Sequence, residues 1–154
     1  MSAKWSEIKI RPMTGADLDA VTLMEQRIFP DAWPREAFEQ DVDSINSGFI
    51  LAESDGVLCG YAGYLMGGGE AQLINIAVAP EYRGKSIAKT LLKHILEIAQ
   101  KADCENLFLE VRPSNKAAIG LYRSFGFLDL YCRPDYYHSP TEDALVMVKN
   151  LRES

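Results

Sequence analysis

The stretch from Ile76 to Ala88 constrains the fold more than any other, because it joins an apolar strand to an amphipathic helix through a short polar loop. The residues from Gln72 to Val78 are predicted to form this strand. Apolar residues then recur at helical spacing, at Ile87, Leu91, Ile95, Leu96 and Ala99. A second apolar strand is expected from Leu107 to Val111. A strand, a helix and a strand in sequence predict a right-handed crossover and locally parallel pairing.

The loop at this junction is predicted to bind an anion. The first backbone N–H groups of a helix lack intrahelical acceptors, and the helix dipole adds about half a positive charge at that end. Arg83 and Lys85 add two positively charged side chains. We therefore expect a phosphorylated ligand at the start of this helix.

Two other interpretations fit the same loop. Gly84-Lys85-Ser86 matches the end of a nucleoside-triphosphate P-loop, but that motif requires a glycine where Ala79 stands, and Glu81 would place a carboxylate among the phosphates. An ordinary strand-to-helix connection with surface Arg and Lys also fits. The order of elements along the rest of the chain is needed to decide between them.

The length predicts one domain over residues 1–154. A chain of this length buries a sufficient core without disulfides or a structural metal. Its three cysteines have no CxxC spacing, and no signal peptide or long apolar run is seen, so a cytoplasmic location is expected. Two histidines do not supply a His-rich site, so no metal is expected. The net charge of −6 argues against nucleic-acid binding, and no membrane contact is expected.

Two helices are expected near the N-terminus, after a strand at Ile8 and Ile10 that ends at Pro12. Thr14 is predicted to cap the first helix together with Asp17. Its predicted apolar stripe is Leu18, Val21, Leu23, Met24 and Ile28. Pro30 ends this helix, and Trp33-Pro34 begins a second one that runs through Phe38 to Val42.

The remaining elements are mostly strands. Asp55-Gly56 is a strong hairpin signal between Phe49–Glu53 and Val57–Met66, because both residues tolerate positive φ. A short helix is predicted from Asn115 to Phe125. The last strands are predicted at Phe127–Arg133 and Ala144–Lys149. The complete order is β-α-α-β-β-β-α-β-α-β-β, which makes this a mixed α/β fold.

This order and the loop resemble the GNAT family of N-acetyltransferases over nearly the whole chain. The family's pyrophosphate loop has Arg or Gln, two residues, Gly, one residue, then Gly or Ala; Arg83 and Ala88 fit, whereas Ser86 replaces the central glycine. Further family motifs follow in order: Leu109-Glu110-Val111-Arg112, Ser114-Asn115, Leu121-Tyr122 and Gly126-Phe127. We expect Ser86 either to adopt a helical φ or to shift the position of the bound phosphate.

The resemblance implies acetyl-CoA as co-substrate. The resemblance implies three groups of contacts with acetyl-CoA. The backbone at the end of the strand contributes Ile76, Ala77 and Val78. The loop and the first helical turn contribute Arg83, Gly84, Lys85, Ser86, Ile87, Ala88 and Lys89, and Asn115 contributes from farther along the chain. Asn115 is also a preferred N-cap for the short helix that follows it. Both roles can hold together.

Glu110 and Tyr122 are the candidate catalytic residues. Glu110 lies in a segment apolar enough for an inner strand, where a carboxylate is costly unless it is paired or used. We expect it to be the general base, although an ion-paired structural glutamate remains the alternative. A phenol is protonated at neutral pH, and the family resemblance makes Tyr122 the acid for the departing thiolate. Tyr122 could also belong only to the core.

Near the C-terminus stands Arg133-Pro134-Asp135-Tyr136-Tyr137, followed by Asp143-Ala144-Leu145-Val146-Met147. This pair of segments resembles the final hairpin of protein Nα-acetyltransferases, above all the bacterial RimI type that acts on ribosomal proteins. In that group paired tyrosines line the entrance for the peptide, which implies substrate contacts for Tyr136 and Tyr137 and for the aromatic-proline segment at Trp33. The implied acceptor is a protein N-terminus, such as the N-terminal alanine of small-subunit ribosomal protein eighteen. Open alternatives are a small-molecule amine acetyltransferase and a non-catalytic acyl-CoA sensor.

Overall fold

The computed structural model describes residues 7–84, 86–138 and 140–152. The chain divides into two compact units. Unit 1 comprises residues 1–64 and 75–95, and unit 2 comprises residues 65–74 and 96–154. The expectation of one domain over residues 1–154 stays a prediction.

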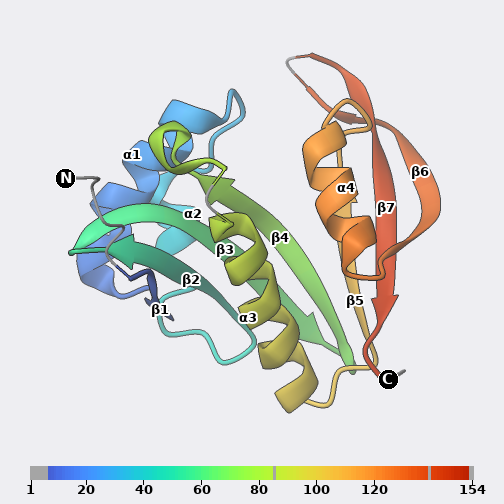
Figure 1. The fold of residues 1–154 in the computed structure, drawn as a ribbon, viewed down its shortest axis with the longest axis horizontal. Helices are drawn as coiled ribbons and strands as arrows, with labels where there is room; N and C mark the ends of the chain where they lie inside the picture. Colours follow the sequence, from blue (N-terminus) through green and yellow to red (C-terminus); the bar gives the residue numbers. More distant parts are fainter. Residues whose placement is uncertain (1–6, 85, 139, 153–154) are drawn as a thin grey trace. The chain divides into compact units, whose positions relative to one another are not determined.

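The predicted element order is confirmed (Figure 1). The strands are β1 (Lys9–Pro12), β2 (Ser47–Ser54), β3 (Val57–Gly67), β4 (Glu70–Val78), β5 (Asn106–Val111), β6 (Leu128–Tyr137) and β7 (Glu142–Asn150). The α-helices are α1 (Leu18–Ile28), α2 (Arg35–Glu39), α3 (Ile87–Lys101) and α4 (Lys116–Ser124). Two 3₁₀ turns, η1 (Gly15–Asp17) and η2 (Pro80–Tyr82), precede α1 and α3.

The strands form a seven-stranded sheet in the order β1-β2-β3-β4-β5-β7-β6. Strand β4 pairs in parallel with β5 through Glu70–Gln72 and Asn106–Phe108, as the crossover predicted. Strand β7 then pairs antiparallel with both β5 and β6. Consequently β5 is an inner strand and β6 is an edge strand.

The core of unit 1 is aromatic and aliphatic, and α1 contributes one face to it. Leu18, Val21 and Met24 are buried as predicted, but Leu23 is 68% exposed, so its assignment to the stripe was wrong. Each residue turns a helix by about 100°, which carries position 23 to the side opposite the stripe and position 25 into it. Glu25 accordingly takes the buried place and is 2% exposed.

The hairpin between β2 and β3 follows the predicted turn chemistry. Asp55 has φ 50° and Gly56 has φ 76°, both in the left-handed region that a tight two-residue turn requires. Farther along β3, Gly63 lies under the ring of Phe49, and a Cβ there would approach that ring to 2.5 Å. Glycine is therefore required for these two strands to carry a buried aromatic ring between them.

Unit 2 holds β5, β7 and β6 with α4 beside them (Figure 1). The alternate residues Leu107, Leu109 and Val111 of β5 are buried. Strand β6 runs to Tyr137, four residues beyond the predicted end at Arg133. Pro134 does not stop it, because an edge strand tolerates a missing N–H. The register instead shifts between Arg133 and Tyr137, where Asp135 has φ 51°.

In the described part of the chain no helix is long and apolar enough to cross a membrane. No group of His, Cys, Asp and Glu side chains in the described ranges could hold a metal ion. Cys59, Cys104 and Cys132 are free thiols.

An ion cluster joins β1, β2 and the turn before α1. Arg11 donates to Asp17 Oδ1 at 2.7 Å and Oδ2 at 2.8 Å, and to Glu53 Oε1 at 3.0 Å. The backbone N–H of Thr14 also donates to the Asp17 carboxylate, at 2.8 Å. The hydrogen bond from Arg11 is the main cause that lowers the pKa of Asp17 from 3.8 to about 2.

We predict that Asp17→Asn removes an acid-sensitive contribution to stability. A lowered pKa stabilises the folded protein above the unfolded-state pKa of 3.8, and this contribution is lost as the pH falls towards about 2. In urea unfolding, the difference in unfolding free energy between wild type and variant should shrink across that interval. Asp19→Asn, whose side chain is 90% exposed, is the control and should show no such change. A difference independent of pH would contradict the Arg11–Asp17 bond.

Candidate active site

The predicted anion-binding loop lies in unit 1 between β4 and α3. Gly84 has φ 79° and Ser86 has φ 64°, so both lie in the left-handed region. A helical φ at position 86, one of the two expectations for this serine, is therefore wrong, because the tight entry into the helix keeps the conformation that glycine prefers. The other expectation, a shifted phosphate, stays a prediction. Lys85 lies outside the described residues.

Hydrogen bonds fix the approach to this loop. Arg83 Nε donates to the carbonyl of Val78 at 3.1 Å, which ties the loop to the end of β4. Glu81, the carboxylate near the loop, is paired with Arg27 of α1 at 2.8 Å. The Ser86 carbonyl accepts the N–H of Thr90 at 3.0 Å, as at the first turn of a helix. The N–H groups of Ile87, Ala88 and Lys89 precede that bond, and the geometry of a helix start leaves such groups without an acceptor inside the helix.

Strand β4 continues beyond its ladder with β5. The parallel register ends at Gln72, whereas β4 runs on to Val78, and no further β4–β5 pair occurs among the described residues. The segment Ile76–Val78 therefore has backbone groups that do not belong to that ladder. On the β3 side the sheet continues, since Ala79 N–H donates to the Cys59 carbonyl at 2.8 Å.

Glu110 lies on β5, in unit 2, and its side chain is 13% exposed. Its carboxylate accepts three hydrogen bonds: from Arg133 Nη1 at 2.5 Å, from the Tyr136 hydroxyl at 3.0 Å and from Gln72 Nε2 at a long 3.4 Å. Glu110 is thus ion-paired, and its partner is Arg133 of β6. The sequence patterns had assigned no site role to Gln72 or Arg133.

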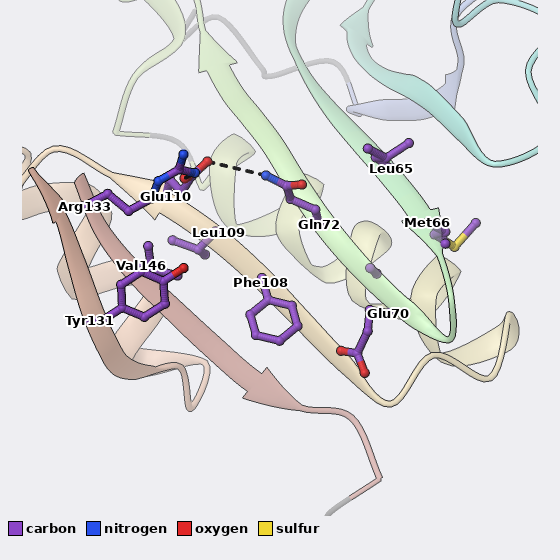
Figure 2. A pocket seen from close by; sticks show the side chains of 12 residues that line it. Leu65, Met66, Glu70, Gln72, Phe108, Leu109, Glu110, Tyr131, Arg133 and Val146 are labelled. Carbon is purple, nitrogen blue, oxygen red and sulfur yellow. Dashed lines mark hydrogen bonds and ion pairs between the residues drawn. The ribbon is translucent and has the colours of Figure 1, made fainter. Parts of the chain in front are cut away.

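A pocket of about 570 Å³ opens beside this carboxylate within unit 2. Figure 2 shows Gln72 and Glu110 facing each other from β4 and β5, with the Arg133 side chain next to Glu110. Phe108 and Tyr131 line the same pocket. The pocket therefore combines apolar walls with charged groups at Glu110, Arg133 and Glu70, which suits a polar group attached to an apolar segment.

The paired tyrosines of β6 have different surroundings. Tyr136 is 39% exposed, and its ring lies under the Arg133 guanidinium, whose carbon is 4.5 Å from the ring centroid. Tyr137 is more buried and lies under Arg112, also at 4.5 Å. Burial raises the pKa of both phenols, so both are neutral donors at neutral pH. Only Tyr136 bonds to Glu110 directly among the described contacts.

Tyr122 and Asn115 belong to α4. The Tyr122 side chain is buried against Phe127, with ring centroids 5.8 Å apart. Burial raises its pKa from 10.0 to about 12. Asn115 is the N-cap, as predicted: its Oδ1 accepts the Ala118 N–H at 3.2 Å. That bond uses the oxygen, so the amide N–H₂ is left as a donor.

A buried carboxylate that the sequence did not reveal lies in unit 1. Glu25 accepts hydrogen bonds from the Tyr61 hydroxyl at 2.5 Å, from the Trp33 backbone N–H at 3.1 Å and from Asn75 Nδ2 at 3.4 Å. In the described part of the chain no ion pair involves it. The Trp33 ring itself packs on Phe38 and Phe49. Glu25 thus fixes the segment between α1 and α2, where Trp33 lies.

The predicted site residues fall into two groups. The loop residues, the end of β4 and Trp33 belong to unit 1. Glu110, Tyr122, Asn115, Tyr136 and Tyr137 belong to unit 2, where the structure joins Glu110 and Tyr136 directly.

Known proteins share this arrangement of elements and motifs. The profile of the acetyltransferase (GNAT) family matches residues 18–127. The chain belongs to the GNAT family. The N-alpha-acetyltransferase RimI of Mycobacterium tuberculosis is 35% identical over 153 residues, covering 96% of this chain and 95% of that protein. The ribosomal protein bS18-alanine N-acetyltransferase of Escherichia coli is 34% identical over 140 residues, covering 90% and 94%.

A solved structure gives the same result for the GNAT fold. The crystal structure of the ribosomal-protein-S18-alanine N-acetyltransferase from Escherichia coli superposes with a TM-score of 0.88 at 31% identity, covering 96% of each chain. The resemblance to the GNAT family and to its RimI-type members, inferred from the motifs, is thereby confirmed, as is the mixed α/β fold. The P-loop interpretation is not supported.

We predict that Ser86→Gly stabilises this GNAT protein. A left-handed conformation costs a residue with a side chain about 1–2 kcal/mol, and glycine avoids that cost. The unfolding free energy should rise by about 1 kcal/mol, and acetyl-CoA should bind at least as tightly in calorimetry. Ser86→Ala is the matched control, because it removes the hydroxyl but keeps the Cβ and should give no gain. Equal stability of wild type and Ser86→Gly would argue against the positive φ.

Proposed function

We propose that the protein transfers the acetyl group of acetyl-CoA to the N-terminal α-amino group of a protein, with a ribosomal protein as substrate. The observation that carries this proposal is Glu110, a carboxylate held on an inner strand at the end of a pocket in a GNAT chain. The named relatives at 34–35% identity act on ribosomal protein bS18 or on α-amino groups, which supports a polypeptide acceptor. A cytoplasmic location would suit that acceptor.

The residues of the loop fit a phosphorylated co-substrate. Left-handed backbone at Gly84 and Ser86 beside a helix N-terminus is a geometry that turns backbone N–H groups towards an anion. Arg83, Ile87, Ala88 and Lys89 complete this proposed pyrophosphate site, with Lys85 outside the described residues. The end of β4 at Ile76–Val78, which lies beyond the β4–β5 ladder, would bind the pantetheine arm, and the amide N–H₂ of Asn115 would donate to coenzyme A.

The acceptor amine must lose a proton before it can attack. An α-amino group has a pKa of about 7.7 to 8.0, against about 10.4 for lysine, so a carboxylate base can supply the neutral form of the former at lower cost. In our proposal Glu110 takes that proton. Acetyl-CoA supplies the activated thioester. Tyr136, Tyr137 and the Trp33 segment would hold the first residues of the polypeptide.

Tyr122 is proposed to assist the leaving thiolate. Its pKa of about 12 keeps the phenol protonated throughout the working range. Complete proton transfer from this phenol to a thiolate would be uphill, because the thiol that forms has a pKa of only about 8.5. The phenol therefore acts best as a hydrogen-bond donor while the carbon–sulfur bond breaks. A small-molecule amine acetyltransferase is the alternative function, and a sensor without catalysis would not need Glu110 at a pocket.

The decisive experiment is Glu110→Gln, assayed by thiol release with a peptide that has a free N-terminus. Loss of a general base should lower kcat by about 10²- to 10⁴-fold. Affinity for acetyl-CoA should stay unchanged, because the loop is not altered. Glu97→Gln, on the exposed side of α3, is the control and should keep full activity. Full activity of Glu110→Gln would remove Glu110 from the mechanism, and transfer only to small amines would favour the alternative function.

Tyr122→Phe should slow the chemical step by about 10- to 10⁴-fold if the phenol donates to the thiolate. Single-turnover kinetics measures this step, and thermal unfolding measures any loss of packing. Tyr64→Phe, a half-buried tyrosine of β3, is the matched control for removing one hydroxyl. A variant that loses only stability and keeps its single-turnover rate would assign Tyr122 to the core alone.

A further inference from the structure

The Arg133–Glu110 ion pair is not explained by the reaction as described so far. Strand β7 lies between β5 and β6, so Arg133 reaches across one strand, roughly 10 Å, to contact Glu110. Small Ala144 on β7 lies opposite Arg133 and leaves room for this reach. The pair occupies the carboxylate oxygen Oε2, while Tyr136 and Gln72 bond to Oε1.

Stability alone does not account for this pair. The Glu110 side chain is 13% exposed and needs donors to replace its lost hydration, but Tyr136 and Gln72 already donate to it. The Arg133 side chain is 49% exposed, and such a cation contributes little to folding through an ion pair. Its guanidinium is nevertheless held in place by the Tyr136 ring on one side and by Glu110 on the other. The hydrogen bond to Glu110 raises the pKa of Arg133, so this group keeps its charge at every relevant pH.

The charge of Glu110 creates a difficulty for an amine acceptor. An opposite charge within about 4–6 Å favours the charged form of a titrating group, so an unpaired carboxylate would stabilise the bound α-ammonium ion. That ion has no lone pair with which to attack. A positive charge beside the carboxylate offsets this effect and leaves the amine free to lose its proton.

We propose that Arg133 is a positioning residue that neutralises the field of Glu110, so that the acceptor α-amino group is deprotonated at neutral pH. This inference rests on the proposed function. The proton passes from the α-ammonium nitrogen through Glu110 to solvent, Glu110 returns to the carboxylate form that Arg133 stabilises, and Arg133 gains or loses no proton. Because the guanidinium also orients Oε2, both carboxylate oxygens are held in fixed directions.

The other groups around Glu110 do not supply this charge. On β6, Tyr136 and Tyr137 are neutral phenols with raised pKa values, and Tyr122 of α4 is neutral for the same reason. Gln72 of β4 carries no charge. Arg112, next along the same face of β5, is paired with Glu142 at 3.4 Å and lies over Tyr137. Arg133 is therefore the cation in contact with Glu110 among the described residues.

The first test is the pH dependence of kcat for Arg133→Gln with a peptide that has a free N-terminal alanine. The acid limb of the pH dependence of kcat reports the pKa of the group that must lose a proton in the enzyme–substrate complex. In Arg133→Gln this limb should move to higher pH by about one unit. Arg133→Lys keeps the charge and should restore most of the wild-type profile. Arg123→Gln breaks an exposed ion pair with Asp129 in the same unit and should leave the profile unchanged.

The second test does not depend on turnover. The same peptide is titrated into the protein saturated with coenzyme A, in two buffers of different ionisation enthalpy, with the Nα-acetylated peptide as control. Wild type should release protons on binding at neutral pH, and Arg133→Gln should release fewer. An unmoved acid limb, equal proton release, or a higher kcat for Arg133→Gln at every pH would each overturn the proposal. Wild type that neither binds nor acetylates the peptide would instead refute the proposed function.

Discussion

The parallel pairing of β4 with β5 is the constraint on which the rest of the structure depends. Parallel neighbours need a crossover connection of a dozen or more residues, and α3 with its two flanking loops provides it. The crossover places the anion-binding loop at the carboxyl end of β4. The register also sets Gln72 opposite Phe108, which brings its amide within reach of Glu110 two residues farther along β5.

Unit 1 shows how a buried charge can hold a loop in place. A carboxylate in a protein interior is costly unless donors replace its lost hydration. Glu25 receives those donors from β3, β4 and the segment between α1 and α2, which are far apart in sequence. The hydrophobic core and the segment that carries Trp33 are thus stabilised by one side chain, and a change in either is expected to disturb the other.

Local patterns predicted the elements well because they depend on local physics. The apolar spacing of α3, the Asp55-Gly56 turn and the Asn115 cap are all properties of a few neighbouring residues, and the structure confirms each. The partners of Glu110 could not be found in this way. Arg133 contacts it from a strand that lies two places away in the sheet, and only the order β5-β7-β6 brings them together.

The side chains of the proposed site come from two kinds of strand, the inner strand β5 and the edge strand β6. Glu110 lies on β5 opposite Val146 of β7, two residues beyond the last pair with β4, and the ladder with β7 gives the proposed base a defined position. Its partners Arg133 and Tyr136 come from β6, which has a free edge and two register irregularities. An edge strand can shift locally without breaking the ladders of the inner sheet. The position of Glu110 therefore depends on the regular ladder between β5 and β7, whereas the positions of Arg133 and Tyr136 depend on the irregular pairing of β6 with β7.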